Sequence, residues 1–302
     1  MKNAIIYFYN MYIDDIRKLN NNYYFSFNNE DYVIEQYNFN IKESVFMYEL
    51  NKEMLDNKIN TYKIILTKEN NVLFEYDGYL YFLMIIPKIR NRIITYEDVI
   101  SFNVYTNNDK ILNTLDKSNW GYYWSEKIDY IEYQFSSIMD KYKVIKNSIN
   151  YYIGLWENAI SYYNDNINDS YTKQVVHKRV DTNMDLLSFL NPINLIIDTK
   201  ERDLGEYFKS YIMNESYTID NLNNMLNKIS LDDIKVKRFI CRIMFPSYYF
   251  DRYDDIMIGI SDEEVLNNII NKNKNVLVLL KILFNKYKNS NIPQIEWIKK
   301  ED

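Results

Sequence analysis

The feature that most constrains the fold is the stretch 175–207, near the middle of the 302 residues. It begins with an apolar run, continues into a polar loop that starts at His177, the only histidine of the chain, and returns to a short apolar run at 194–197. The pattern predicts a strand that ends at Asp198, followed by a helix that opens near Arg202. Any fold assigned to this chain must explain a strand that delivers a carboxylate just after a histidine-led loop.

Kinase-like phosphotransferases build their phosphate and metal site from such a pattern. An Asp in the loop accepts the hydroxyl proton of the substrate, and an Asn and a second Asp hold magnesium, with the loop spaced His-x-Asp-x-x-x-x-Asn. Anchored on His177, this spacing places Arg179 at the Asp position and Met184 at the Asn position. A guanidinium stays protonated and cannot accept a proton, and a thioether is a poor ligand for magnesium. The loop is therefore predicted to be degenerate.

A shifted register leaves an alternative open. It would offer Asp181 as the base and Asn183 as the amide, but it abandons the usual spacing. Asp198 fits the carboxylate that holds magnesium, and it fits an ordinary strand-end Asp equally well. We therefore assign no catalytic role within the degenerate loop (His177, Arg179, Asp181, Asn183) and name Asp198 as the candidate metal ligand.

The front of the chain lacks the usual features for binding nucleotide phosphates. The strand at 32–37 should supply a lysine, but it offers Glu35 and Gln36, and a carboxylate there would repel ATP. No glycine-rich loop lies near 23–27, and the whole chain has only 5 Gly. No cofactor is predicted from these residues. ATP and magnesium are expected as cofactors only if the chain is an active enzyme.

The order of the predicted elements suggests two lobes. In the front part, Asn28-Asn29 and Asp77-Gly78 are hairpin signals between β-rich runs. The expected front elements are a helix at 1–19, strands at 23–27 and 32–37, a helix at 44–56, and strands at 62–66, 72–76 and 79–86. The expected back elements are long helices with buried faces at 120–138 and 145–163, further helices at 219–229 and 231–245, a helix after the capping box 261–264, and a last helix at 275–287.

This layout predicts an α+β, protein-kinase-like fold of two lobes. Residues 1–90 would form a small antiparallel sheet with one helix, and residues 91–302 a larger, mainly helical lobe that carries the His loop and Asp198. In the helical lobe we expect Asp203 to tie down the following helix, and Trp297 to pin the tail.

Composition excludes several classes of function. The net charge of −6 argues against a nucleic-acid binder, which normally has a basic face. One cysteine, Cys241, allows no intrachain disulfide, and with a single histidine a zinc site is not expected. No window approaches about 18 uninterrupted apolar residues, so no membrane span is predicted and the chain is expected to be cytosolic. The 31 Tyr reflect either an AT-rich genome or an adhesive surface suited to an assembly.

Several segments of the back part resemble one known family, the YutH-type spore coat proteins of the CotS group. Besides His177-Lys178-Arg179 and the strand that ends at Asp198, the resemblance rests on Trp120 and Trp124 in one helix. It also includes YYIGLWENAISYYND at 151–165, RDLGEY at 202–207 and RFICRIMFPSYYFD at 238–251. The resemblance is dense from about 120 to 257, and in the first ninety residues only the order of strands and helix agrees.

The resemblance implies a kinase-like fold of the aminoglycoside and choline phosphotransferase type in a protein of the bacterial endospore coat. It implies that arginine is usual in this loop of the group, so that phosphotransfer was lost by inheritance. The leading hypothesis is a catalytically silent pseudokinase with a structural or scaffolding role in the coat. Its partners would be other coat proteins, and it would be made in the mother-cell cytoplasm. The alternative is an unorthodox ATP-dependent phosphotransferase, a small-molecule or protein kinase, that uses Asp198 for magnesium and Asp181 as base.

Overall fold

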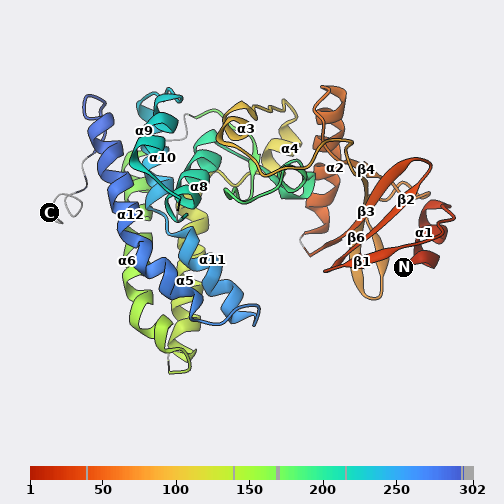
Figure 1. The fold of residues 1–302 in the computed structure, drawn as a ribbon, viewed down its shortest axis with the longest axis horizontal. Helices are drawn as coiled ribbons and strands as arrows, with labels where there is room; N and C mark the ends of the chain where they lie inside the picture. Colours follow the sequence, from red (N-terminus) through yellow and green to blue (C-terminus); the bar gives the residue numbers. More distant parts are fainter. Residues whose placement is uncertain (39, 139, 168–170, 215, 294, 296–302) are drawn as a thin grey trace.

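A β-rich lobe and a helical lobe lie at opposite ends of an elongated molecule (Figure 1). The computed structural model describes residues 1–38, 40–138, 140–167, 171–214, 216–293 and 295. We call α1 to β6 the N-terminal lobe and α3 to α12 the C-terminal lobe. The small antiparallel sheet and the larger helical part were both predicted. A boundary near residue 90 stays a prediction.

The N-terminal lobe is a six-stranded sheet in the order β1-β2-β3-β6-β4, with β5 paired to β6, and every pairing is antiparallel. Both predicted hairpin turns are confirmed, since Asn28, Asn29, Asp77 and Gly78 all have positive φ, as two-residue turns matching the strand twist require. The elements are α1 (Lys2–Tyr9), β1 (Arg17–Leu19), β2 (Asn22–Phe27), β3 (Glu30–Tyr37), α2 (Ile41–Asp56), β4 (Lys63–Ile65), β5 (Phe74–Tyr76) and β6 (Tyr79–Ile85).

The predicted first helix was too long. It ends at Tyr9, because Asn10 adopts the left-handed conformation (φ 56°) and closes the helix. The chain then adds a short edge strand, β1, in which Lys18 pairs with Tyr23 of β2. A helical spacing of apolar residues continues through this segment, but strand pairing overrides it.

Both faces of this sheet are buried, which fixes the direction of the side chains on β3. Tyr32 and Ile34 face α1 in one apolar cluster, whereas Val33 and Tyr37 belong to the main core shared with α2 and the C-terminal lobe. Since side chains alternate along a strand, Glu35 shares the inward face of Val33 and Tyr37. The sheet thus presents Glu35 toward the junction of the lobes.

The C-terminal lobe is built around long helices and one small two-stranded ladder, β7 and β8. The elements are α3 (Tyr96–Ser101), α4 (Asp109–Thr114), α5 (Trp120–Ile138), α6 (Lys143–Asn166), β7 (Gln174–His177), α7 (Leu186–Phe189), η1 (Pro192–Asn194), β8 (Leu195–Asp198), α8 (Lys200–Ile212), α9 (Ile219–Asn227), α10 (Asp233–Met244), α11 (Ser247–Met257) and α12 (Val265–Lys286).

The two helices predicted near the C-terminus are one, α12, and the predicted capping box was wrong. Glu264 precedes α12 without a side-chain cap. Glu263 instead accepts hydrogen bonds from the backbone N–H groups of Lys143, Val144 and Ile145 at the start of α6, which has no cap of its own. Local spacing had assigned the capping role to Glu264, whereas the structure uses the neighbouring Glu263 to cap a helix that is distant in sequence. Trp297 lies outside the described residues.

Aromatic packing joins the long helices into one core. Trp124 of α5 stacks on Phe245 with ring centroids 4.1 Å apart, and Trp156 of α6 packs edge-on against both Phe245 and Phe250. Cys241 is fully buried between these helices, and its thiol donates to the carbonyl of Ala159. Aromatic rings thus fill the buried faces that were predicted for α5 and α6.

The start of α3 gives a testable pH dependence. Asp98 accepts two hydrogen bonds from Arg92 and completes a capping box with Thr95, and the Arg92 guanidinium lowers the pKa of Asp98 to about 2. Because this folded-state pKa lies below the unfolded value, the contribution is present above about pH 4 and is lost as the pH falls toward 2. We expect Asp98→Asn to cost about 1 kcal/mol of unfolding free energy at pH 7, and to flatten the decline between pH 4 and 2. Urea unfolding at several pH values measures both, and an unchanged acid slope would contradict the assignment.

Candidate functional site

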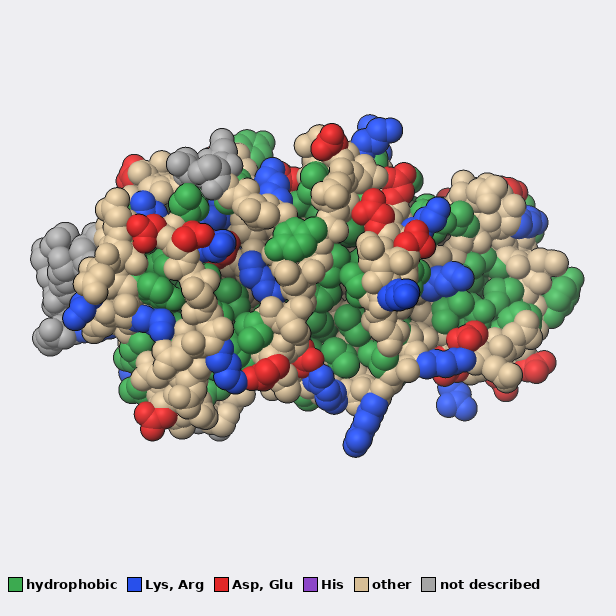
Figure 2. Space-filling view, turned by 90° about the horizontal axis from the view of Figure 1, so that it is seen from above, with side chains coloured by type: hydrophobic (Ala, Val, Ile, Leu, Met, Phe, Trp, Pro, Cys, Tyr) green, Lys and Arg blue, Asp and Glu red, His purple; other side chains and the backbone are tan. Residues whose placement is uncertain are grey.

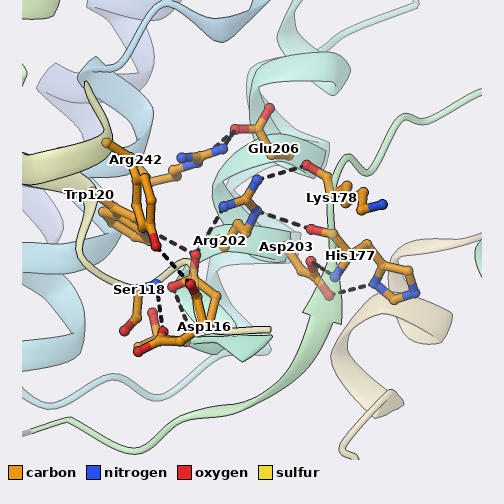
Figure 3. A network of polar contacts seen from close by, with 12 residues as sticks. Asp116, Ser118, Trp120, His177, Lys178, Arg202, Asp203, Glu206 and Arg242 are labelled. Atoms are coloured by element: carbon orange, nitrogen blue, oxygen red, sulfur yellow. Dashed lines mark hydrogen bonds and ion pairs between the residues drawn. The ribbon is translucent and has the colours of Figure 1, made fainter. Parts of the chain in front are cut away.

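The β7–β8 ladder positions the two residues singled out from the sequence. Gln174 pairs with Asp198 and His177 pairs with Leu195, so His177 and Asp198 lie at opposite ends of the antiparallel ladder. Arg202, in the first turn of α8, bridges them. It donates to the carbonyls of His177 (3.0 Å) and Lys178 (2.9 Å) (Figure 3). It also donates to Asp198 Oδ2 (3.0 Å).

The Asp198 carboxylate is surrounded by donors of the protein itself. Trp120 Nε1 donates to Oδ2 at 2.8 Å, and the backbone N–H of Thr199 donates to Oδ1 at 2.7 Å. The guanidinium of Arg238 lies 3.5 Å from Oδ1. Asp198 and Arg238 are both 0% exposed. Two cations and two neutral donors therefore fill the coordination positions that a metal ion would need.

Arg238 is held in turn by aromatic rings and polar groups. Its guanidinium lies 4.2 Å from the ring centre of Trp120 and 3.9 Å from that of Tyr171. It also donates to Thr199 Oγ1 and to the carbonyl of Ser118. This packing fixes the cation beside the carboxylate away from the surface, so the pair is a built part of the core.

His177 is a structural residue of this core. Its ring Nδ1 lies 2.7 Å from Asp203 Oδ2, its Nε2 lies 2.9 Å from the carbonyl of Phe189, and its backbone N–H donates to Asp203 Oδ1. The ring stacks on Phe189 and is fully buried. Asp203 of α8 therefore ties the helix to the end of β7, the structural role we expected for it.

Arg179 faces away from any reacting centre. Its Nε and Nη2 each donate at 2.6 Å to the two carboxylate oxygens of Asp251 on α11, a bidentate pair. Burial disfavours the cation, but Asp251 outweighs it and raises the pKa of Arg179 above its ordinary value. The position that carries the catalytic base in active kinases thus anchors the loop to a helix.

The residues of the shifted register differ from Asp198 in exposure, since Asp198 is fully buried. Asp181 is exposed and accepts a hydrogen bond from the backbone N–H of Asn183 in a tight turn, and Asn183 is exposed as well. Met184 is partly buried against the main core, and its carbonyl accepts from Ile94. The loop is thus held by backbone contacts to the linker between the lobes.

The lobe junction opposite this loop is charged and closed by hydrogen bonds. Asn191 donates to Glu35 at 2.7 Å, Thr61 donates to the carbonyl of Leu190, and Lys117 pairs with Glu43 of α2. Burial raises the pKa of Glu35, partly offset by Asn191 and by the charge of Lys178.

Lys178 is the candidate to replace the phosphate-binding lysine that β3 does not supply. Burial lowers its pKa to about 8, against the opposing effects of Glu43 and Glu35. The positive charge of Lys178 interacts with these two carboxylates, so negative groups of the protein already balance it.

These residues do not fit ATP with magnesium. Asp198 has its oxygens occupied, Arg179 and Met184 offer no oxygen ligand, and Glu35 stands where a phosphate-binding cation is needed. Within the described ranges, no three His, Cys, Asp or Glu side chains are grouped so that they could hold a metal ion.

The comparison with known families decides the assignment. The sequence matches the family described as "Spore coat putative kinase YutH" over residues 2–277. The chain belongs to this family. The resemblance noted in the sequence is thereby confirmed over nearly the whole chain, including the front part where it was thin. No curated protein matches the sequence.

Solved structures show the fold. An aminoglycoside phosphotransferase from Alicyclobacillus acidocaldarius superposes with a TM-score of 0.64 at 8% identity, covering 96% of this chain and 97% of that one. The spectinomycin phosphotransferase APH(9)-Ia, in complex with ADP and spectinomycin, gives 0.58 at 12% identity, covering 94% and 96%. Choline kinase LicA from Streptococcus pneumoniae gives 0.50 at 11% identity, covering 87% and 93%. At such identities the likeness shows the kinase-like fold, which was predicted.

The family is one of spore coat proteins. None of the helices within the described ranges combines the length and apolar character needed to span a bilayer. On the face seen in Figure 2, basic and acidic side chains are interspersed and do not form one basic surface.

Sequence reasoning missed the partners that define the site. Arg202 was read only as a helix start, Arg238 only as part of a family segment, and Asp251 was given no role. A basic residue four positions after a strand-end Asp is a signal that could have indicated the Arg202 pair. Nothing local marks Arg238, which is 40 residues away from Asp198, or Asp251, which is 72 residues away from Arg179.

The Arg179–Asp251 pair gives a direct test by charge reversal. Arg179→Asp restores the residue type of an active kinase, but it places a carboxylate against Asp251. Since the pair is partly exposed, we expect a loss of about 1–2 kcal/mol and no gain of ATP turnover. Adding Asp251→Arg should recover most of the loss. Arg252→Asp, on the same helix, breaks only an exposed pair with Asp255 and serves as the control. Equal stability of the single and double variants would refute the pairing.

Proposed function

We propose that this protein is a catalytically silent, kinase-like scaffolding protein of the bacterial endospore coat. The observation that carries the proposal is the Asp198 carboxylate, which is fully buried and shared by Trp120, Arg202 and Arg238. In a working phosphotransferase this carboxylate must remain available to magnesium. Oδ2 already accepts from Trp120 and Arg202, and Oδ1 accepts from the backbone N–H of Thr199 beside the Arg238 guanidinium, so neither oxygen keeps that availability.

Three other residues that differ from those of active kinases also support the loss of phosphotransfer activity. Arg179 is engaged with Asp251, Met184 supplies no hard ligand, and Glu35 adds negative charge where phosphates would lie. Each removes a separate requirement, so reverting one of them does not restore the reaction. We therefore assign no cofactor, and we propose that the fold was kept for its surface.

Membership in a spore coat family supports a location in the coat. We propose that the chain is made in the cytoplasm of the mother cell and then becomes part of the coat, with other coat proteins as partners. The charge of −6 and the interspersed surface charges support protein partners over nucleic acid.

One observation favours the alternative, an ATP-dependent phosphotransferase. Lys178 brings a buried cation from another element close to Glu35, where an active enzyme needs a lysine. The alternative also requires the carboxylates of Asp181 and Asp198 to share one metal ion. Asp181 is exposed in its turn and Asp198 is sealed, which supports the silent protein over the enzyme.

Calorimetric titration of ATP, with and without magnesium, tests the proposal on the full chain. We expect no magnesium-dependent binding and no turnover, either alone or with spore coat extract as substrate. Magnesium-dependent binding that is lost in a folded Asp198→Asn variant and kept in Asp181→Asn would show a working metal carboxylate. Turnover lost in both variants would establish the phosphotransferase.

A further inference from the structure

The solvent-facing side of α5 is an unusual surface for a protein of this kind. Tyr122, Tyr130 and Tyr133 are 58%, 59% and 78% exposed, and Tyr123 is 40% exposed. Together with Glu126 and Asp129 they recur at three- and four-residue steps, so they share one face of the helix. We call these six residues the α5 tyrosine face. The opposite side of α5 carries Trp120, Trp124, Ile128 and Ile131, all buried in the core.

The exposed aromatic area of this face is large, as judged from the described residues. A tyrosine side chain presents on the order of 200 Å² when fully exposed, so the four rings offer a few hundred Å² in one stripe. Patches of that size on a monomer are often functional. Tyrosine is also enriched where proteins bind each other, because one end of its ring is apolar and the other forms hydrogen bonds.

The charges on the face have one sign. Glu126 and Asp129 are exposed, and within the part of the chain described by the structure neither forms an ion pair or a side-chain hydrogen bond. The one lysine among the neighbouring positions, Lys127, is turned aside and pairs with Asp254 of α11 at 2.7 Å. The face therefore combines aromatic rings with carboxylates that have no cation of their own.

The molecule itself shows how such rings take up a cation. The ammonium group of Lys117 lies 5.4 Å from the ring centre of Tyr123 while it pairs with Glu43. A cation held between a tyrosine face and a carboxylate is the arrangement that Tyr130 and Tyr133 offer beside Glu126 and Asp129.

We propose that the α5 tyrosine face binds a lysine- or arginine-rich segment of a partner protein. Its cations would lie over the rings and pair with Glu126 and Asp129, and their aliphatic stems would cover the ring surfaces. A second copy of this chain fits poorly, because two such faces would oppose like charges in a protein that already has a net charge of −6. The proposal deepens the scaffold role and rests on it, since it names the chemistry of the partner.

The length of the face sets the size of the probe. From Tyr122 to Tyr133 the helix rises by about 16 Å, which an extended segment covers with about five residues. A synthetic peptide of four Lys-Ser repeats is therefore long enough, and four Glu-Ser repeats give the probe of opposite charge.

Titration of the full chain with both peptides, by calorimetry at low and at physiological salt, tests the proposal. We expect saturable binding of the Lys-Ser peptide that weakens with salt, and none of the Glu-Ser peptide. Tyr130→Ser/Tyr133→Ser and Glu126→Gln/Asp129→Asn should each raise the dissociation constant at least tenfold.

Matched variants separate this face from general attraction to an acidic protein. Tyr7→Ser/Tyr12→Ser removes two exposed rings, and Asp14→Asn/Asp15→Asn removes the same charge, both in the N-terminal lobe. These should change the dissociation constant less than twofold. Absence of saturable binding, or equal weakening by the matched variants, overturns the proposal. Self-association that the α5 variants abolish, without peptide binding, overturns the choice of partner. The ATP titration fails or succeeds independently of these results.

Discussion

Replacing Asp198 with asparagine is expected to lower the free energy of unfolding by about 3–5 kcal/mol, because it leaves buried cations without their counter-charge. Arg238 is 0% exposed, and Arg202 is only 11% exposed at its side chain. Asparagine keeps the size of the side chain, so the loss reports on charge and hydrogen bonding and does not reflect a cavity. Urea unfolding followed by circular dichroism measures it.

The control for this experiment is Asp181→Asn, in the exposed turn of the same loop. We expect it to cost less than about 1 kcal/mol, since an exposed Asx turn is replaced by a similar one. The comparison separates two roles for Asp198. A carboxylate kept free for magnesium contributes little to the stability of the metal-free protein, and its removal often stabilises. A loss below about 1 kcal/mol for Asp198→Asn would therefore favour the enzyme.

Glu206→Gln is expected to have an effect of similar size, about 3–5 kcal/mol, in a second buried network. Glu206 Oε1 accepts from Lys209 Nζ at 2.9 Å and from Arg242 Nε at 2.7 Å, while Oε2 accepts from Ser247 at 2.9 Å. Although burial opposes its charge, Lys209 and Arg242 lower the pKa of Glu206 far below its ordinary value. Glu157→Gln, on the exposed side of α6, is the control and should be neutral.

Lys209 in the same network adds a second pH dependence, in a higher pH range than that of Asp98. Burial lowers its pKa to about 7, against the attraction of Glu206. The unfolded chain then binds more protons than the folded chain between about pH 7 and 10, so this group makes stability rise with pH over that window. Lys209→Met should remove the rise and should cost less than Glu206→Gln, because Glu206 keeps Arg242. A profile that is unchanged in the variant would contradict the assignment.

The network of Glu206, Lys209 and Arg242 forms where α8 packs closely against α10. A Cβ added at Gly205 would lie 2.5 Å from Cγ of Arg242, so only glycine lets the arginine pass beside the helix. The segment 202–207 thus supplies one partner to each of three polar pairs. Arg202 pairs with Asp198, Asp203 with His177, and Glu206 with Arg242.

Much of the fold followed from local sequence. The turns at Asn28-Asn29 and Asp77-Gly78 determined two hairpins, because few residues tolerate positive φ at both turn positions. The aromatic spacing determined the buried faces of α5 and α6. One failure occurred at Arg17–Leu19, where pairing with the adjacent strand β2 prevailed over the helical spacing, and another at the predicted capping box, where Glu263 caps the distant helix α6.

The sequence by itself determined that Arg179 and Met184 stand at the two loop positions where the kinase spacing expects Asp and Asn, because that spacing is read along the chain. Only the tertiary structure decided what became of the remaining carboxylate. Arg238 reaches Asp198 from α10, 40 positions along the chain, and Trp120 from α5, 78 positions before it. Contacts over such separations leave no periodic or spacing signal, since they are selected by packing of whole helices and not by neighbouring residues.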